Sequence, residues 1–367
     1  MSNVVLYRKY RPQKFSEVIG QEHVVQTLTN SIKANNISHA YLFTGPRGSG
    51  KTTLARLFAK AINCEDKSFF EPCNKCSSCL DIQASKSIDL IEIDAASHTG
   101  VDDIRELIEG IKFAPVKSKY KIFIIDECHQ LSKAAANALL KTLEEPPAHA
   151  VFLLATTESH KMISTIVSRC QRFDFKRLQV PEIIKKLQFI SQKENIKFED
   201  SALSLIALNS RGSFRDAESL LDECISFSGQ SSLVKTEDIK GLLGVVDVAE
   251  VSNFIDLVLN KNTKDALLCI NHLADTGTDI QEFSKTLVFY LRQSLLFKIN
   301  PASLNAQTSG FSVEEINKIK AQIEKLGPKD IQKILEIFIE AENKVRYSSI
   351  PQLPLELAIV DITHHEI

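Results

Sequence analysis

The chain contains the stretch Gly45-Pro46-Arg47-Gly48-Ser49-Gly50-Lys51-Thr52, which has the spacing Gly-x-x-x-x-Gly-Lys-Thr. An apolar run at 40–44 precedes it, and residues 53–60 have helical spacing. In a strand–loop–helix context, inward-pointing backbone N–H groups and the helix N-terminus together attract phosphate. We predict that Lys51 reaches the β- and γ-phosphates of ATP, that Thr52 ligates Mg²⁺, and that the nucleotide-binding set extends to Thr53. The alternative is a glycine-rich surface loop with no ligand.

Two carboxylates follow another apolar run, at 120–125. Asp126 is suited to holding Mg²⁺ through water, and Glu127 to orienting or deprotonating the attacking water. A solvated turn is the simpler interpretation, but the pairing with the phosphate loop favours an ATPase site. Asp-Glu-Cys-His also resembles a helicase motif, which we discount because a second ATPase-like half is missing. We interpret His129 as a local hydrogen-bonding residue.

Short apolar runs alternate with amphipathic segments through the first half of the chain. Strands are predicted at 40–44, 88–94, 120–125 and 150–155, and helices at 22–34, 101–111 and 132–145. This alternation predicts a mostly parallel sheet with helices on both faces and ligands at the carboxyl ends of its strands. Thr157 follows the last of these strands, where a hydroxyl either senses the γ-phosphate or simply ends the strand.

Four cysteines lie close together in the sequence, with the spacing Cys-x8-Cys-x2-Cys-x2-Cys: Cys64, Cys73, Cys76 and Cys79. Four thiolates complete a closed tetrahedral shell, so we predict a structural Zn²⁺ rather than a catalytic one. The alternative is a chance grouping of buried cysteines. Four further cysteines are isolated, and for these we expect simple packing roles: Cys128, Cys170, Cys224 and Cys269.

Length and composition set wider limits. A chain of 367 residues predicts two or three domains, and 44% hydrophobic with 25% charged residues is ordinary for a globular protein. The net charge of −2 argues against a globally basic nucleic-acid coat, although it leaves room for a local basic patch. The sequence predicts no signal peptide and no bilayer-spanning run, and cysteines beside a nucleotide loop favour a reducing cytoplasm.

The N-terminal segment offers a possible adenine site. Tyr10, Arg11 and Pro12, together with Val18 and Ile19, can form an apolar slot for a purine ring. An equally good interpretation is that this segment and the following helix only pack against the sheet.

Several motifs in one order carry a family resemblance. They are Tyr-Arg-Pro-x-x-Phe-x-x-Val-Ile-Gly-Gln from Tyr10, the phosphate loop, the four cysteines, Asp-Ala-Ala-Ser at 94–97, Asp-Glu-x-His, Leu-Leu-Lys-Thr-Leu-Glu-Glu-Pro-Pro at 139–147, Leu-Leu-Ala-Thr-Thr-Glu and Ser-Arg-Cys. Together they resemble the ATPase (gamma/tau) subunits of the bacterial DNA polymerase III clamp loader, which are AAA+ proteins. The match is dense over 1–216 and weaker afterwards.

The resemblance implies roles for further residues. Arg169 would act in trans as a finger on the ATP of a neighbouring subunit, Thr157 would be the first sensor, and Arg215 would be the second sensor in the lid. One departure concerns a loop that is basic in some relatives and here reads His98-Thr99-Gly100, which weakens the case for phosphate contacts there and leaves Arg105 as the nearby cation.

The remaining sequence is helical by pattern and lacks a catalytic signature. We predict an α/β AAA+ domain at 1–179 with a zinc module at 64–79, an all-α lid at 180–243, and an all-α collar at 244–367 that the resemblance implies is used for oligomerisation. The resemblance further implies an ATPase that opens a sliding clamp and loads it onto primer–template DNA, within a hetero-oligomeric ring and away from membranes. The chain ends where the collar would, so we expect the long partner-binding tail of tau to be absent.

Two other functions remain open at this point. One is a non-hydrolysing stator of the same ring, which would have no use for an intact Lys51, Thr52, Asp126 and Glu127. The other is an AAA+ remodeller of other proteins or of DNA junctions, which would not respond to a sliding clamp. Subunit order, stoichiometry, DNA contacts and the state of the isolated chain cannot be predicted from the sequence.

Overall fold

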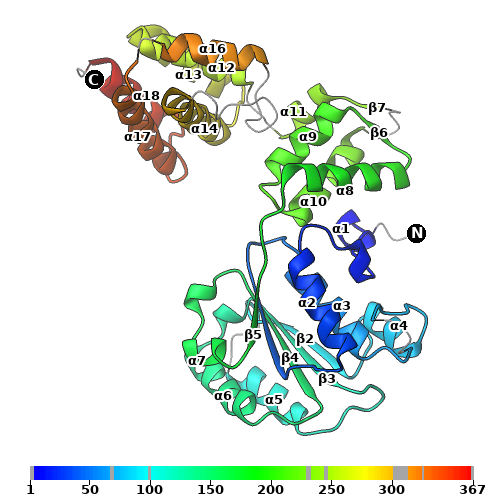
Figure 1. The fold of residues 1–367 in the computed structure, drawn as a ribbon. Helices are drawn as coiled ribbons and strands as arrows, with labels where there is room; N and C mark the ends of the chain where they lie inside the picture. The colour runs from blue at the N-terminus through cyan, green and yellow to red at the C-terminus, as the bar shows by residue number, and fades with distance from the viewer. Residues whose placement is uncertain are drawn as a thin grey trace. The chain divides into compact units, whose positions relative to one another are not determined.

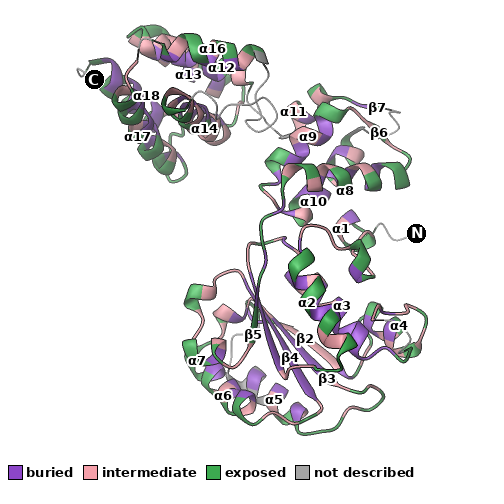
Figure 2. Ribbon diagram, in the orientation of Figure 1, coloured by how far each residue is buried: buried purple, intermediate pink, exposed green. Residues whose placement is uncertain are grey.

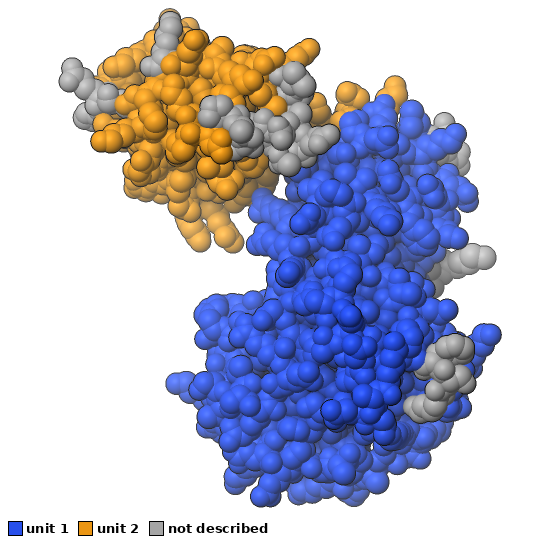
Figure 3. Space-filling model, viewed as in Figure 1, with its two compact units in different colours: residues 1–234 blue, residues 235–367 orange. Residues whose placement is uncertain are grey.

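The computed structural model describes residues 4–66, 70–97, 101–228, 233–243, 247–300, 313–324 and 326–364. The chain divides into two compact units, Met1–Val234 and Lys235–Ile367 (Figure 3). Among the described residues, no helix combines the length and the apolar character needed to cross a bilayer.

The first unit is built on a five-stranded sheet in which every neighbouring pair is parallel (Figure 1). Its strands, in spatial order, are β2 (Leu90–Asp94), β3 (Lys121–Asp126), β4 (Ala150–Thr156), β1 (Ala40–Thr44) and β5 (Gln171–Asp174). Asp94 pairs with Asp126, and Thr44 pairs with Thr156. The carboxyl ends of β2, β3, β4 and β1 therefore lie at nearly the same level, on one side of the sheet.

Helices cover both faces of this sheet, as predicted. Side chains alternate along β1, so Tyr41 and Phe43 join one core while Ala40 and Leu42 join the other. The first core includes residues of α2 (Glu22–Lys33) and α3 (Lys51–Ile62), and the second includes residues of α5 (Val101–Ile111) and α6 (Lys133–Glu144). In Figure 2 the inner strands are almost entirely buried while the outer faces of these helices are exposed.

The sheet differs from the prediction at two places. β2 begins at Leu90 rather than residue 88, because Asp89 lies in a turn where its carboxylate accepts the backbone N–H groups of residues 116–118. β5 was not predicted. Only Phe173 of this edge strand is buried, so its sequence lacks the apolar run that reveals the inner strands.

Short elements complete the α/β part of the unit. They are α1 (Leu6–Lys9), η1 (Phe15–Glu17), α4 (Ser77–Gln83), η2 (Cys128–Gln130), η3 (Ser159–Lys161) and α7 (Ser164–Val167). The cysteine segment lies between α3 and β2 and includes α4. η1 inserts Phe15, 2% exposed, into the core beneath α2 and α3.

Three helices follow the sheet within the same unit: α8 (Val180–Lys193), α9 (Asp200–Asn209) and α10 (Phe214–Ser228), with the two-residue strands β6 (Lys197–Phe198) and β7 (Leu233–Val234). A capping box between Gln179 and Glu182 starts α8. α1 packs on α10, and the Leu6 backbone N–H donates to Asp222 at 3.3 Å. We call α8 to α10 the lid.

The second unit is helical throughout its described part. Its helices are α11 (Thr236–Leu243), α12 (Val248–Leu259), α13 (Thr263–Asp275), α14 (Ile280–Ile299), α16 (Val313–Ile323), α17 (Pro328–Val345) and α18 (Leu353–His364). Side chains of Asp247, Asn262 and Asp279 cap three of these helices. Its core centres on a ring contact of Phe254 with Phe283 and Phe338. The compact units divide between residues 234 and 235, so α11 is grouped with this unit, and the lid boundary at 243 stays a prediction.

Candidate active site

The phosphate loop connects β1 to α3 and has three glycines with positive φ: Gly45 (φ 146°), Gly48 (φ 73°) and Gly50 (φ 97°). At Gly48 a Cβ atom would lie 1.8 Å from Oγ of Ser213, and the Phe214 backbone N–H donates to the Gly48 carbonyl at 3.2 Å. Glycine is thus required here both by conformation and by the close approach of the lid. The loop is consequently in direct contact with the start of α10.

Lys51 is the first residue of α3 and is only 6% exposed. Its Nζ donates to the carbonyls of Gly45 and Pro46 at 2.8 and 2.9 Å, so the ammonium lies inside the curve of the loop. Burial lowers the pKa of Lys51, and the negative charges of Glu127 and Asp126 oppose that change. The loop therefore holds a buried cation that interacts electrostatically with the carboxylates at the end of β3.

Thr52 and Asp126 meet directly. The Thr52 hydroxyl donates to Oδ2 of Asp126 at 2.7 Å, although the two residues are 74 positions apart in the sequence. Asp126 ends β3, and the second oxygen of its carboxylate accepts the Glu127 backbone N–H at 2.9 Å. A hydroxyl and a carboxylate at this spacing are the oxygen ligands that Mg²⁺ prefers.

Glu127 adopts the left-handed conformation at φ 47°, which turns the chain sharply after β3. Its Oε2 accepts the Thr157 backbone N–H at 3.2 Å and the Thr157 hydroxyl at 2.9 Å. The predicted sensor and the predicted base are therefore in contact across the ends of β4 and β3. A non-glycine residue at this φ is uncommon, and such residues are frequent at functional sites.

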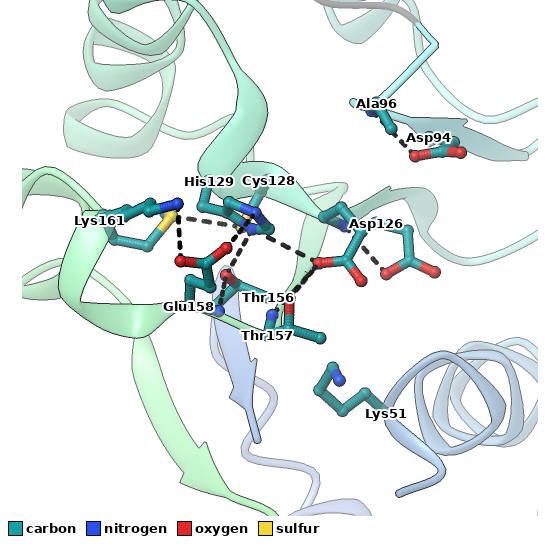
Figure 4. A network of polar contacts seen from close by, with 12 residues as sticks. Lys51, Asp94, Ala96, Asp126, Cys128, His129, Thr156, Thr157, Glu158 and Lys161 are labelled. Carbon is teal, nitrogen blue, oxygen red and sulfur yellow. Dashed lines mark hydrogen bonds and ion pairs between the residues drawn. The ribbon is translucent and has the colours of Figure 1, made fainter. Parts of the chain in front are cut away.

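Beside this carboxylate, a polar network joins His129, Thr156, Glu158 and Lys161 (Figure 4). The His129 ring, 6% exposed, lies with Nδ1 3.4 Å from Oε2 of Glu127 and 3.0 Å from the hydroxyl of Thr156. Its Nε2 lies 3.5 Å from Glu158, which pairs with Lys161 at 2.7 Å. The prediction of a local hydrogen-bonding role for His129 was right, but its position beside Glu127 is not visible in the sequence.

A cavity of about 760 Å³ opens beside the phosphate loop, within the first unit. Its lining includes residues 47–53, Asp126 and Glu127, and four of the five predicted adenine-slot residues: Arg11, Pro12, Val18 and Ile19. Tyr10 is not in the lining. Its hydroxyl donates to Glu194 and its ring meets Phe189 edge-on, so this side chain packs on α8 and the structure does not bring it into the slot.

The lid contributes residues that sequence reasoning mostly missed. Arg215, the second residue of α10, lines the cavity, with its guanidinium 5.1 Å from the centre of the Tyr7 ring, and its role as second sensor stays a prediction. Lys186 and Glu218 also line it, 4.0 Å apart. Burial raises the pKa of Glu218 to about 7, opposed by Lys186 and Arg11. In the sequence, these two residues look like ordinary surface residues of amphipathic helices, so they were not predicted.

Arg169 lies away from this cavity. It follows α7, and its guanidinium pairs with Glu144 at 2.6 Å and donates to the Thr165 carbonyl at 2.8 Å. Its side chain is 34% exposed. This placement is compatible with action outside its own site, and that role stays a prediction. His98 and Gly100 lie outside the described residues, as does the side chain of Arg105.

The four cysteines of the predicted metal site come together, with all four Sγ atoms within 4.8 Å of one another. Backbone N–H groups point at the sulfurs: Cys73 Sγ accepts from Lys75 and Cys76 at 3.4 and 3.3 Å, and Cys76 Sγ accepts from Cys79 at 3.4 Å. The first two bonds lower the pKa of Cys73 to about 6, whereas burial raises the pKa of Cys79. None of the eight cysteines is in a disulfide. The cluster has the composition and size to hold one metal ion.

Three family models match consecutive parts of the chain. "DNA polymerase III, delta subunit" matches residues 20–179, "DNA polymerase III clamp loader subunit, ATPase lid domain" matches 182–230, and "DNA polymerase III subunits gamma and tau domain III" matches 234–366. A solved structure, the RuvB branch-migration motor of Thermotoga maritima, is similar with a TM-score of 0.49 and 19% identity over 86% of this chain and 91% of that one. That likeness is too low to bear on the assignment.

Curated relatives give the same family. The DNA polymerase III tau subunit of Bacillus subtilis is 43% identical over the whole of this chain, which spans 64% of that protein, and the tau subunit of Escherichia coli is 38% identical over 98% of the chain and 55% of the relative. The gamma subunit of Buchnera aphidicola is 40% identical over 82% of the chain and 81% of its own length. The resemblance inferred from the motifs is confirmed. The chain belongs to the gamma/tau subunit family of DNA polymerase III.

Proposed function

We propose that this protein is an ATP-hydrolysing subunit of a clamp loader, which uses ATP to open a sliding clamp and load it onto primer–template DNA. The observation that carries the proposal is the contact of Thr52 with Asp126, beside Glu127 and at the wall of a cavity that also holds Lys51. A stator that does not hydrolyse ATP gains nothing from a buried Lys51 beside two partly buried carboxylates, because removing charges from water costs free energy.

The chemistry follows from the roles of these side chains. Lys51 and the N–H groups of the loop bind the β- and γ-phosphates, and Thr52 and Asp126 hold Mg²⁺ directly or through water. Mg²⁺, when bound, neutralises charge on the phosphates. Glu127, oriented by Thr157, takes the proton of the attacking water.

Two arginines complete the proposed site. Arg215 contacts the γ-phosphate from the lid, because it already lines the cavity at the start of α10. Arg169 acts on the nucleotide of a neighbouring subunit, in keeping with its place outside its own cavity. Hydrolysis is then shared between subunits of a hetero-oligomeric ring.

The metal of the cysteine cluster is, in our proposal, a structural Zn²⁺. A tetrahedral shell with Zn–S bonds of about 2.3 Å has sulfur–sulfur separations of about 3.8 Å. Cys73 Sγ and Cys79 Sγ are 3.9 Å apart. Cys64, Cys73, Cys76 and Cys79 leave no position for a reacting water, so the ion supports the fold. Unpaired thiols also agree with a cytoplasmic location.

The proposal is tested by measuring ATP turnover of the assembled complex with and without sliding clamp and primed DNA. We expect clamp and DNA together to stimulate turnover, and Lys51→Ala to abolish it. If the protein hydrolysed no ATP under any condition, the result would favour a non-hydrolysing stator subunit instead. Turnover that the clamp does not change would favour a remodeller of other proteins or DNA junctions.

A further inference from the structure

The segment 11–19, which we call the N-terminal wall, forms one side of the cavity. Its lining members are Arg11, Pro12, Gln13, Glu17, Val18 and Ile19. Most of this wall has no regular secondary structure, since η1 covers only three of its residues. Its position must therefore be set by contacts from outside the segment.

The cysteine module, defined as residues 64–66 and 70–79, supplies such contacts. The two carboxylate oxygens of Glu71 accept the backbone N–H groups of Phe15 and Ser16 at 2.8 and 3.0 Å. Asn74, between two of the cysteines, donates its Nδ2 to the Gln13 carbonyl at 3.3 Å. The two Glu71 bonds satisfy N–H groups at the start of η1, which have no partner within the helix itself, and the Asn74 bond satisfies a carbonyl just before it.

A buried cation holds the wall from the other side. Lys60, 3% exposed and in the last turn of α3, donates its Nζ to Oε1 of Gln13 at 2.8 Å. The same ammonium lies 3.5 Å from Oε1 of Gln83, the last residue of α4. Gln13 is thus fixed between the cysteine module and the helix that starts at the phosphate loop.

The proposed zinc site would order the module. The four Sγ atoms come from both ends of the module and lie within 4.8 Å of one another, so one ion bound to them would cross-link a segment whose described residues include only the start of α4. Glu71 lies two residues before Cys73, so its place is set by the fold of the cluster. Ordering at the cysteines is therefore passed through Glu71 to Phe15 and Ser16.

We propose that the cysteine module positions the N-terminal wall and thereby sets the affinity of the cavity for nucleotide, with Glu71 as the main positioning residue. The inference rests on the proposed nucleotide site and adds a role for the module beyond its own stability. Because Pro12, Val18 and Ile19 are apolar, the wall is suited to the base of the nucleotide rather than to its phosphates.

The test compares Glu71→Ala with Glu65→Ala, using the full chain and ribose-labelled fluorescent ATP and ADP. Glu65 is the matched control, because among the described residues its carboxylate bonds Ser77 and Ser78, both inside the module, at 2.7 and 3.4 Å. We expect Glu71→Ala to lower the affinity for both ATP and ADP by about tenfold, which is the effect of losing a charge-assisted hydrogen bond. Glu65→Ala should stay within about twofold of the parent.

Two further readouts do not depend on activity. Metal analysis should find the same metal content in parent and Glu71→Ala, while amide exchange in residues 13–19 becomes faster in the variant. Stripping the metal from the parent should reproduce the loss of affinity, and stripping it from Glu71→Ala should add little. Asn74→Gly, which preserves the φ of 59° and removes the side-chain bond to Gln13, should show a smaller loss in the same direction.

The inference is overturned if Glu71→Ala binds both nucleotides as the parent does, or if metal removal leaves the affinity unchanged. It is also overturned if the variant loses affinity for ATP but not for ADP, because the wall would then act on the γ-phosphate. A parent chain that binds neither nucleotide would instead reject the proposed function itself, and with it this inference. If Glu71→Ala lost its metal, an unchanged affinity in metal-bound Asn74→Gly would count against the inference and a reduced one would support it.

Discussion

The two compact units bury different kinds of side chain. Among its described residues, the first unit buries six charged side chains: Lys51, Lys60, Asp89, Lys121, Lys186 and Glu218. In the described part of the second unit, the buried polar residues are neutral: Ser252, Ser284, Ser294 and Thr363. A buried charge lowers stability unless it is paired, so a unit retains such groups where they serve structure or chemistry.

The cavity separates these two uses. Lys51, Lys186 and Glu218 line it, whereas Asp89 binds three backbone N–H groups of a turn and Lys121 donates to the Gly110 carbonyl at 2.7 Å. Burial of charge alone therefore does not mark a site. A site is indicated where buried charges line the same cavity as the phosphate loop. The described residues of the second unit include no buried charge.

The largest effect we expect concerns a charge outside the cavity. Arg169→Ala should lower clamp- and DNA-stimulated turnover by about 10³–10⁵-fold and leave ATP binding by the isolated chain nearly intact, because a guanidinium supplied in trans stabilises charge only in the transition state. Turnover and nucleotide affinity are measured separately. A helix-end arginine that only pairs with Glu144 predicts a small loss of stability and normal turnover.

Mixing variants decides whether the site is shared. Rings assembled from Arg169→Ala and Lys51→Ala subunits contain some interfaces that pair an intact loop with an intact neighbouring arginine. Those interfaces should recover stimulated hydrolysis. Assembled rings with no recovered activity, or a fully active Arg169→Ala ring, would contradict a shared site.

The next effect concerns the carboxylate at the end of β3. Glu127→Gln should lower turnover by about 10²–10⁴-fold and retain ATP binding, because Asp126 and Thr52 still meet while the water loses its base. Single-turnover hydrolysis and equilibrium binding check the two halves of this statement. Turnover at the parental rate would remove Glu127 from its assigned role.

Sequence reasoning succeeded where spacing fixes geometry. The phosphate loop, Asp126 and the four cysteines were predicted because their patterns are local, and the inner strands because they are continuous apolar runs. It failed where tertiary contact decides. β5 has one buried side chain, and Tyr10 packs on the lid although its neighbour Arg11 lines the cavity. Lys186 and Glu218 were missed because nothing in the sequence shows that α8 and α10 face the loop.

A matched pair of core substitutions compares the units directly. Phe152 stacks on Phe123 in the sheet, with ring centres 5.4 Å apart, and Phe338 meets Phe254 in the second unit at 6.0 Å; both are fully buried. Phe152→Ala and Phe338→Ala should each lower the unfolding free energy of their own unit by about 3–5 kcal/mol. Only Phe152→Ala should weaken nucleotide binding. Amide exchange of β4 and α17 reports the stability of the two units. A reduced nucleotide affinity in Phe338→Ala would contradict the assignment of nucleotide binding to the first unit alone.

The smallest effect concerns the pH dependence of the lid. Burial raises the pKa of Glu218 from 4.5 to about 7, against the opposing charges of Lys186 and Arg11. Because the folded state holds this proton more tightly than the unfolded state does, the contribution of Glu218 to stability is full below pH 4.5. It is lost as the pH rises through about 7. The full change amounts to about 3 kcal/mol.

Glu218→Gln tests that sign, because the amide keeps the shape of the protonated acid and does not titrate. Amide exchange from α10 is compared between parent and variant at each pH, so that intrinsic exchange rates cancel. The parent should lose protection relative to Glu218→Gln between about pH 5 and 7, and the difference should level off above that range. Glu223→Gln is the control on the same helix, because Glu223 is exposed and is not among the residues that line the cavity. A parent that gains protection relative to Glu218→Gln as the pH rises would mean that Lys186 pairs with the ionised carboxylate strongly enough to outweigh burial.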